Sequence, residues 1–314
     1  MLGFLRKFKL IRDPHEYHFC CIYLDKQGLS IAVSNNQNSS NCLIIEYLNF
    51  IPFPENPTFE HINYLLDQYV KEHHLKDIST CCILDRELYR LILIDIPDNI
   101  PKGELREASK WLIKDLLDFP MDDLASDLFT LPKYAEHESK AYVCVTKKHM
   151  LKIRQQQIIS AELNLKQMSI LDLALTALTA HLTENTIYLL VSLLSSHSTL
   201  LLTMNGSLYL KHDLDNHIDF SNENRPLTDL DVLPKHIENF VNYFLAQLSQ
   251  TFPVEILVLP TGHYTEIIVD EIQKSLSYPV KKIDINPLFS FPNNTSQKMI
   301  DDCFVSLGGL LNMR

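Results

Sequence analysis

The sequence predicts an α/β protein built from two lobes, and three observations support this prediction. The chain has 314 residues, more than a single hydrophobic core usually encloses. Each half opens with three short strand-like runs and continues into alternating helical and strand-like segments. Apolar residues make up 46% of the chain, which excludes wholesale disorder. This duplication of elements is typical of two lobes that face each other across a cleft.

The first half contains short apolar runs bounded by turn-forming residues. These runs predict strands at 18–25, 29–34, 42–50, 79–84, 89–96, 142–146 and 168–171. Apolar residues spaced three and four apart predict helices at 59–73, 150–163 and 174–182. Strands and helices therefore alternate along this half, as in an α/β lobe.

The most informative stretch of the first half runs from Glu104 to Leu128. Its apolar residues recur at steps of three and four, at Leu105, Ala108, Leu112 and Leu116. Charged residues occupy the other faces, so the stretch predicts an amphipathic helix that ends before Pro120. Trp111, the only tryptophan of the chain, lies on the flank of this stripe. The helix is interpreted either as a core helix with one half-buried aromatic or as a helix whose edge lines a groove for another chain.

The second half repeats the opening of the first. Strands are predicted at 187–194, 199–204, 208–213, 254–259 and 280–285, and helices at 234–250, 265–276 and 301–312. The run 185–210 lacks charged side chains, but polar residues interrupt its centre and Asn205-Gly206 is a hairpin signal. We therefore interpret this run as strands and not as a membrane span.

Composition limits the classes of partner and the compartment. A net charge of −11 argues against nucleic acid, because phosphate binding needs a basic surface. The seven cysteines lack metal-binding spacing and lie mostly in apolar runs, which indicates a reduced, cytoplasmic protein. No secretory signal is found at the N-terminus. The segment MLGFLRKFKLIR there mixes basic and apolar residues, so it is either a solvated end or a weak anchor to an anionic membrane surface or a partner.

Several segments, in one order along nearly the whole chain, carry a resemblance to a known family. They are MLGFLRKF, CILDRELYRLILIDIPD, ELREASKWLIKDLLDFPMDD with SDLFTLP, MNGSLYLKHDL, VLPTGHYTEII with YPVKKIDINPLF, and VSLGGLL. Together they resemble the MshI-type biogenesis proteins of the mannose-sensitive haemagglutinin (MSHA) pilus. These proteins are relatives of the PilM proteins of type IV pilus systems.

The resemblance implies an actin-like fold, of the PilM-like, FtsA-like and ribonuclease H-like type, with two lobes and a central cleft. The domains expected from it are a basic segment at 1–16, a first lobe at 17–173 with a small insert at about 86–165, a second lobe at 174–290, and a C-terminal helix at 291–314 that packs back on the first lobe. It further implies a cytoplasmic protein at the inner face of the inner membrane, in the platform that assembles the pilus.

The resemblance also implies partners. PilM-like proteins bind the short N-terminal cytoplasmic tail of a bitopic PilN-like membrane protein, in the lobe that carries the Glu104–Leu128 stretch. We hypothesise that Trp111 and Phe119 line the groove for this tail. Membrane association would then be peripheral, through the partner, and the assembly motor ATPase is a further possible partner.

The loops expected to hold nucleotide depart from the family pattern. Phosphate loops need small residues, because side chains block the approach of backbone N–H groups. In the first loop Asp25, Gly28 and Ser30 remain, but Gln27 replaces a glycine and Ala32 replaces a lysine. In the second, Ser192 and Leu194 stand where the relatives have Asp and Gly. The third keeps Gly262.

We therefore predict a pseudo-ATPase with a degenerate nucleotide cleft and no required cofactor. Weak binding of ATP with magnesium remains an alternative. No catalytic motif such as a P-loop or HExxH is found. Asp213, Asp215 and His217 share one strand face and could offer metal ligands, but a polar strand end is the favoured interpretation, so no metal site is predicted.

Two functions of different classes remain open. The first is an actin-like adaptor that recruits a membrane protein to a pilus-assembly platform. The second is an active actin-like ATPase with divergent loops. A third interpretation is a structural protein held at a surface by its basic N-terminal segment.

Overall fold

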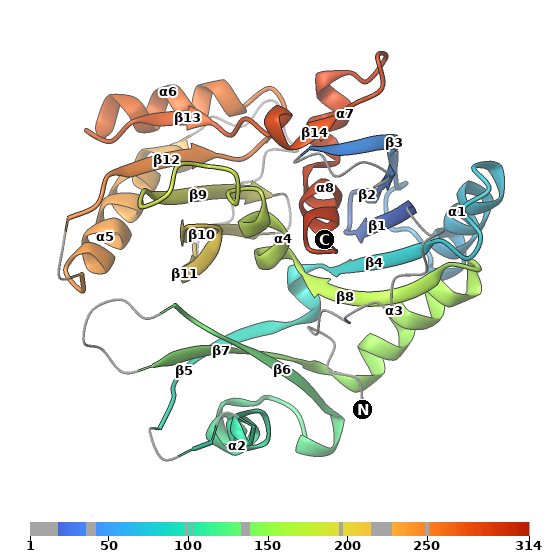
Figure 1. The fold of residues 1–314 in the computed structure, drawn as a ribbon, viewed down its shortest axis with the longest axis horizontal. Helices are drawn as coiled ribbons and strands as arrows, with labels where there is room; N and C mark the ends of the chain where they lie inside the picture. The colour runs from blue at the N-terminus through green and yellow to red at the C-terminus, as the bar shows by residue number, and fades with distance from the viewer. Residues whose placement is uncertain are drawn as a thin grey trace.

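The computed structural model describes residues 18–35, 42–97, 100–101, 103–132, 139–194, 197–214, 228–248 and 251–313. The basic N-terminal segment, Asp215 and His217 lie outside the described residues. Three sheets form the framework, and the strand-and-helix order predicted from the sequence is found in it (Figure 1).

The first sheet has six strands in the order β14-β3-β2-β1-β4-β8. Its strands are β1 (His18–Leu24), β2 (Gly28–Asn35), β3 (Leu43–Pro52), β4 (Ser79–Leu84), β8 (Asn164–Ile170) and β14 (Phe289–Ser290). β1, β2 and β3 form an antiparallel meander, whereas β4 and β8 run parallel to β1. The carboxyl ends of β1, β4 and β8 therefore meet at one edge of this sheet.

The second sheet repeats this arrangement with five strands in the order β11-β10-β9-β12-β13. They are β9 (Ile187–Leu194), β10 (His197–Met204), β11 (Ser207–Asp213), β12 (Val254–Val258) and β13 (Val280–Lys282). β9, β10 and β11 form the antiparallel meander, and β12 runs parallel to β9. The duplication suspected from the sequence is thus present in the strand order.

The third sheet is smaller and belongs to the predicted insert. β5 (Arg90–Asp95), β7 (Lys140–Lys147) and β6 (Leu124–Thr130) pair antiparallel in that order. α2 (Leu105–Leu112) lies on the side of this sheet that faces away from the other two sheets (Figure 1). Ile92, Ile94 and Val143 from the sheet pack with Ile113 in a separate small core.

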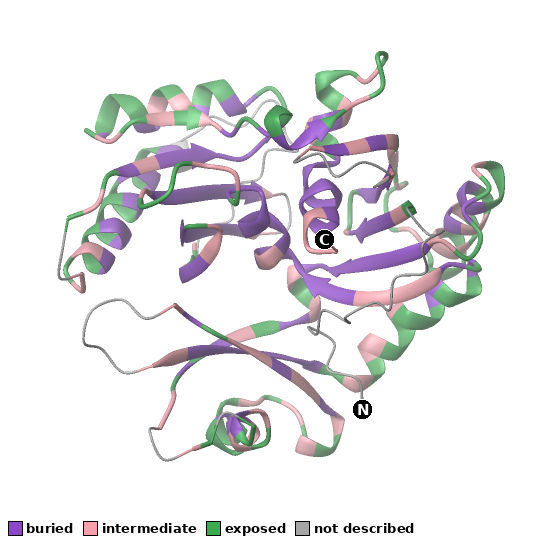
Figure 2. Ribbon diagram, viewed as in Figure 1, coloured by how far each residue is buried: buried purple, intermediate pink, exposed green. Residues whose placement is uncertain are grey.

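The remaining helices cover the two large sheets. They are α1 (Phe59–Glu72), α3 (Lys148–Ser160), α4 (Leu171–Ala177), α5 (Leu233–Leu245), α6 (Thr265–Ser275), α7 (Gln297–Asp302) and α8 (Phe304–Leu311). α4 and α8 lie between the two large sheets and are buried over most of their length (Figure 2). The other helices are exposed on their outer faces (Figure 2).

A pair of glycines lets α8 pack closely against its neighbours. A Cβ atom on Gly308 would lie 2.2 Å from the carbonyl oxygen of Ala174, and one on Gly309 would lie 2.3 Å from the sulfur of Cys21. Real Cβ contacts are essentially never shorter than 3.0 Å. The segment VSLGGLL therefore allows the last helix to contact α4, β1, β2 and β4. The domain boundaries expected from the resemblance stay predictions.

Two predicted helices are divided or cut short in the structure, and those predicted at 174–182 and 234–250 each end about five residues earlier than predicted, at Ala177 and Leu245. The single helix predicted at 301–312 is two helices, because Cys303 leaves the α region with φ −112° and ψ 8°. The helix predicted to extend almost to Pro120 ends at Leu112, and a 3-10 turn (Lys114–Leu116) follows it.

The apolar stripe predicted for this helix is also wrong in part. Leu105, Ser109 and Ile113, one helical turn apart, are its buried positions. Leu112 and Leu116, which were expected to belong to the core, are exposed. The reason is that α2 packs on the small sheet through the face that carries Leu105, Ser109 and Ile113, which leaves Leu112 on another face, and that Leu116 lies beyond the end of the helix.

The apolar run 185–210 contains β9, β10 and part of β11, as predicted. Among the described residues, no helix is long and apolar enough to cross a membrane.

Candidate functional site

Three aspartates follow the neighbouring parallel strands β1, β4 and β8 at the sheet edge where their carboxyl ends meet. Asp25 follows β1, Asp85 follows β4, and Asp172 lies in the first turn of α4 after β8. Ligands of α/β proteins commonly bind outside the carboxyl ends of parallel strands. This edge is therefore the first candidate for a functional site.

Of these three, Asp25 was predicted from the sequence as a site residue, whereas Asp85 and Asp172 were not. A signal was present, because all three follow a leucine at the end of an apolar run, in Tyr-Leu-Asp once and in Ile-Leu-Asp twice. A single aspartate after a strand is unremarkable. Three such positions on adjacent strands form a cluster only once the strand order is known.

The carboxylate of Asp25 is bonded to its own turn. The backbone N–H groups of Gln27 and Gly28 donate to its Oδ1 atom at 2.8 and 2.9 Å. Burial raises the pKa of Asp25 from 3.8 to about 6, although these two N–H groups oppose the shift. The donors that would approach a phosphate at this turn are thus already engaged by a side chain of the chain itself.

The other two predicted residues of this hairpin have structural contacts. A Cβ atom on Gly28 would lie 2.5 Å from the carbonyl oxygen of Ile51, so Gly28 permits close packing against β3. Ser30 is buried, and its hydroxyl lies 2.6 Å from that of Ser306 in α8. The C-terminal helix therefore covers the position where the sequence suggested a ligand-facing serine.

Asp85 and Asp172 are buried and each accepts a hydrogen bond from a tyrosine. The hydroxyl of Tyr23 donates to Asp85 at 2.8 Å. The hydroxyl of Tyr89 donates to Asp172. Burial and the adjacent carboxylates raise the pKa of both tyrosines well above the usual value, so both remain protonated donors.

The second lobe contributes the other predicted positions. Ser192 lies in β9 and is fully buried, and its hydroxyl has no hydrogen-bond partner within the described part of the chain. Gly262, with φ +61°, lies in the turn between β12 and α6. The N–H of Thr261 in this turn donates to the Thr265 hydroxyl at 2.8 Å. In this turn, as in the turn of Asp25, a backbone N–H donates to a side chain of the same turn.

Titratable groups of the second lobe lie near two of the three aspartates, Asp85 and Asp172. Burial lowers the pKa of His197 in β10, although Asp85 and Asp172 favour its charged form. Lys211 and Asp213 in β11 are close enough to pair with groups of the first lobe. Both signs of charge therefore lie where β11 approaches the carboxyl ends of β4 and β8.

The two predicted partner-binding residues lie in different surroundings within the insert. Trp111 is 70% exposed, and the Lys114 ammonium lies 5.8 Å from its ring centroid. Phe119 is half-buried and packs on the small core of the insert, with Lys147 at 5.6 Å from its ring. Trp111, Leu112 and Leu116 are exposed apolar side chains at the end of α2 and in the turn after it, and we call this set the α2 face.

The α2 face is solvent-exposed, but the helix beneath it is fixed to the small sheet by buried contacts. Arg106 of α2 pairs with Asp127 of β6, whose side chain is buried. Ser109 is buried against the sheet, and Ile113 is fully buried in the small core. The side chains beneath the face thus fix its orientation, while Asp115 and Asp118 beside it are exposed.

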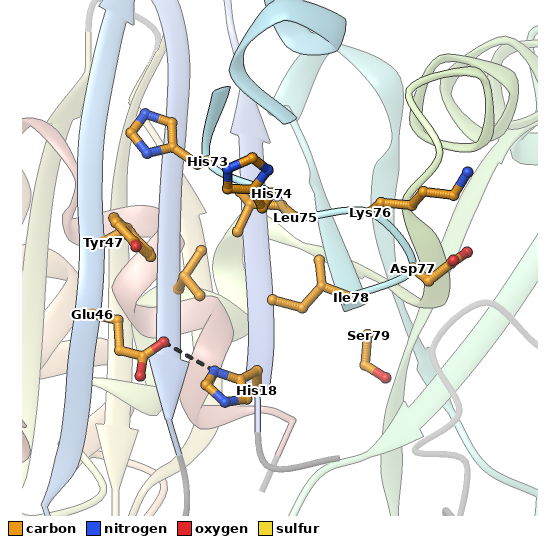
Figure 3. Close-up of a pocket in the computed structure, with 11 residues that line it drawn as sticks. His18, Glu46, Tyr47, His73, His74, Leu75, Lys76, Asp77, Ile78 and Ser79 are labelled. Carbon is orange, nitrogen blue, oxygen red and sulfur yellow. Dashed lines mark hydrogen bonds and ion pairs between the residues drawn. The ribbon is translucent and has the colours of Figure 1, made fainter. Parts of the chain in front are cut away.

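A hollow of about 420 Å³ lies at the opposite end of the first sheet. His18 at the start of β1, Tyr47 on β3 and His73 and His74 after α1 line it (Figure 3). His18 pairs with Glu46 at 2.9 Å, and the His73 ring contacts those of Tyr69 and Tyr47 in tilted arrangements. The polar and aromatic side chains around this hollow therefore contact each other. These contacts do not pair a nucleophile with a base.

Within the described ranges, no group of three or more His, Cys, Asp or Glu residues could hold a metal ion. Asp213, one of the three possible ligands considered from the sequence, pairs with Arg86 and Lys211 instead.

Comparisons with solved structures show what this arrangement is similar to. A chain of a PilM–PilN type IV pilus biogenesis complex matches with a TM-score of 0.74 and 16% identity, over 94% of this chain and 98% of that one. The cytoplasmic domain of EpsL, an inner-membrane component of the type II secretion system of Vibrio cholerae, matches with a TM-score of 0.51 and 10% identity, over 93% and 94%. The actin-like, two-lobed α/β fold predicted from the sequence is thereby confirmed.

A Bacteroides thetaiotaomicron protein of unknown function, described as having an actin-like ATPase fold, has a TM-score of 0.49 and 12% identity, over 99% and 98%. No protein-family model and no curated protein matches the sequence.

Proposed function

We propose that this chain is a cytoplasmic scaffold of an inner-membrane platform that assembles a type IV pilus. The observation that carries the proposal is the similarity to the PilM–PilN biogenesis complex over nearly the full length of both chains. The similarity to the EpsL cytoplasmic domain supports the same class of role, because EpsL is an inner-membrane component of a related kind of machine. The MshI type of the MSHA pilus is the finer assignment, and it rests on the sequence segments quoted above.

In this proposal the partner is the cytoplasmic tail of a PilN-like bitopic membrane protein, and the α2 face binds it. Three large apolar side chains stand exposed there on a rigid support. Exposed apolar side chains that gather in one place often mark a binding surface. Cytoplasmic segments next to membrane spans are rich in Lys and Arg, which suits the exposed Asp115 and Asp118 beside the face.

The only tryptophan provides a direct test of this binding site. Titration with a synthetic PilN-like tail peptide should shift the Trp111 emission to shorter wavelength, because the indole leaves water. By calorimetry, Trp111→Ser and Leu116→Ser should each weaken binding at least tenfold. Phe119→Ser tests the second residue of the hypothesis, with a thermal melt to exclude unfolding.

Tyr243→Ser is the matched control, since Tyr243 is a similarly exposed aromatic on α5 in the second lobe. Full binding by the Trp111 and Leu116 variants would remove the α2 face from the proposal. It would leave the scaffold role to be tested with the intact membrane partner.

The proposal includes a cleft that does not hydrolyse nucleotide. Support comes from backbone donors at two of the three expected loops, which bond to Asp25 and Thr265 of the chain itself. Ser30, covered by Ser306, adds to this support. Backbone groups used in this way cannot also hold a phosphate without rearrangement of the turn.

The second candidate is an active actin-like ATPase, and the three aspartates at the carboxyl ends of β1, β4 and β8 favour it. Calorimetric titration with Mg-ATP separates the two functions. Tight, magnesium-dependent binding that Asp25→Ala abolishes would support the ATPase. If neither the wild type nor Asp25→Ala gives a heat of binding with Mg-ATP, and the wild type binds the PilN-like tail peptide, the scaffold is supported.

A further inference from the structure

The end of β11 carries two side chains that contact distant parts of the chain. Nη2 of Arg86, which follows β4, donates to Oδ2 of Asp213 at 2.7 Å. Nζ of Lys211 donates to the other oxygen of Asp213 at 2.6 Å. Asp213 therefore bridges two cations. Arg86 follows β4 of the first sheet, and Lys211 lies in β11 of the second sheet.

The contacts continue into a closed ring. Nζ of Lys211 lies 3.8 Å from Oδ1 of Asp172, at the start of α4. Asp172 accepts a hydrogen bond from the Tyr89 hydroxyl, and Arg86 donates to the Tyr89 carbonyl at 2.5 Å. Arg86, Asp213, Lys211, Asp172 and Tyr89 thus each contact the next, and we call this set the interlobe ring.

The ring is balanced in charge, and one half of it is removed from water. It contains two cations and two carboxylates; the side chains of Lys211 and Asp172 are only 4% and 2% exposed, whereas those of Arg86 and Asp213 are 19% and 48% exposed. Burial would raise the pKa of Asp213, but the Arg86 hydrogen bond and the two cations outweigh it and lower the pKa to about 2. Removal of Lys211 would leave the buried Asp172 carboxylate without its cation at low dielectric, which is unfavourable.

The same strand end is also attached to the insert. The backbone N–H of Lys211 donates to the hydroxyl of Tyr142 on β7 at 2.9 Å. β11 is the edge strand of the second sheet, so this N–H points away from the sheet's own ladder. One short segment, 211–213, therefore contacts the first lobe through Arg86 and Asp172 and the insert through Tyr142.

We infer that the interlobe ring is a latch that holds the second lobe against the first lobe and the insert without a bound ligand. A ligand in a cleft can hold two lobes together by contacting both. Here the chain's own charged side chains make contacts of that kind. The latch thus gives the cleft one fixed geometry and couples the insert to the second lobe.

Hydrogen–deuterium exchange tests the latch in the full chain. Arg86→Gln and Asp213→Asn should each speed amide exchange in β11 and β7 at least tenfold. The double variant should resemble either single one, because both changes open the same ring. The inner strands β9 and β12 should keep the wild-type exchange rate.

Two further variants keep the result interpretable. Tyr142→Phe removes only one hydroxyl and should speed exchange of the β11 peptide that contains Lys211. Lys281→Gln breaks the Lys281–Glu255 pair, which lies within the second sheet, and should leave β11 and β7 unchanged. Unchanged exchange at β11 and β7 in folded latch variants would overturn the inference, as would an increase spread evenly over all strands.

Discussion

The interlobe cleft and the α2 face are opposite kinds of surface. At the predicted cleft, Asp25 bonds to its own turn and Ser30 lies against Ser306, although the buried Ser192 hydroxyl has no partner among the described residues. On the α2 face, Trp111, Leu112 and Leu116 stand exposed to solvent. Buried polar groups are costly without partners, and exposed apolar groups are costly without cover. The difference teaches that polar groups at the predicted cleft bond to groups of the same chain, whereas the α2 face has apolar area available to another molecule.

The largest expected effect is the loss of a buried charge from the cleft. Asp172→Ala leaves the Tyr89 hydroxyl and the Lys211 ammonium without their shared carboxylate, so it should lower the free energy of unfolding by about 3–5 kcal/mol. Urea denaturation measures the change. Asp270→Ala, at an exposed position on α6, is the control and should have little effect. A loss below about 1 kcal/mol for Asp172→Ala would mean that the cleft is not a stabilising element.

A second effect concerns pH and Asp25. Its pKa is raised by burial from 3.8 to about 6 in the folded state, so the folded state holds this proton more tightly than the unfolded state. Stability should therefore fall as the pH rises from about 4 to about 6, by an amount on the order of 2–3 kcal/mol. Asp25→Asn should remove this part of the pH dependence and leave the variant more stable than the wild type at pH 7.5.

The control for this titration is Asp284→Asn. Asp284 accepts the Asn286 N–H in a similar local turn, but it is exposed. Its variant should keep the wild-type dependence of unfolding free energy on pH. An identical pH profile for Asp25→Asn and the wild type would contradict the burial of this carboxyl.

A smaller effect is expected where two hydroxyls meet beneath α8. Ser306→Ala leaves the buried Ser30 hydroxyl without its partner on α8 and should cost about 1–2 kcal/mol. Adding Ser30→Ala should cost less than the sum of the two single changes, because the pair then disappears together. Chemical denaturation of the four proteins gives the coupling free energy, and strict additivity would show that the hydroxyls do not interact.

The smallest effect belongs to the α2 face. Trp111→Ser should change the free energy of unfolding by less than about 0.5 kcal/mol, since the indole contacts little of the fold. In the wild type, iodide should quench the fluorescence of this exposed indole efficiently. A destabilisation above about 1 kcal/mol would show that Trp111 is part of the insert core, and the contrast with the cleft would then disappear.

The candidate site was predictable from the sequence only where its signal is local. Asp25 was identified through the family resemblance, which matches it to the aspartate at the end of the first strand, and the structure places it in the turn after β1. Asp172 and Lys211 were missed because no nearby residues indicate that they meet. Arg86 and Asp213 are 127 positions apart, and only the strand order brings them into contact.

Local chemistry in the sequence was sufficient for the order of strands and helices and for the repeat of a three-strand meander in each half. These features follow from the spacing of apolar residues and from turn-forming residues, which act over a few positions. Tertiary structure alone decided which side of α2 is buried, where the last helix breaks, and which charges pair across the cleft. Those outcomes depend on which segments pack against each other, and packing joins residues that are far apart in the chain.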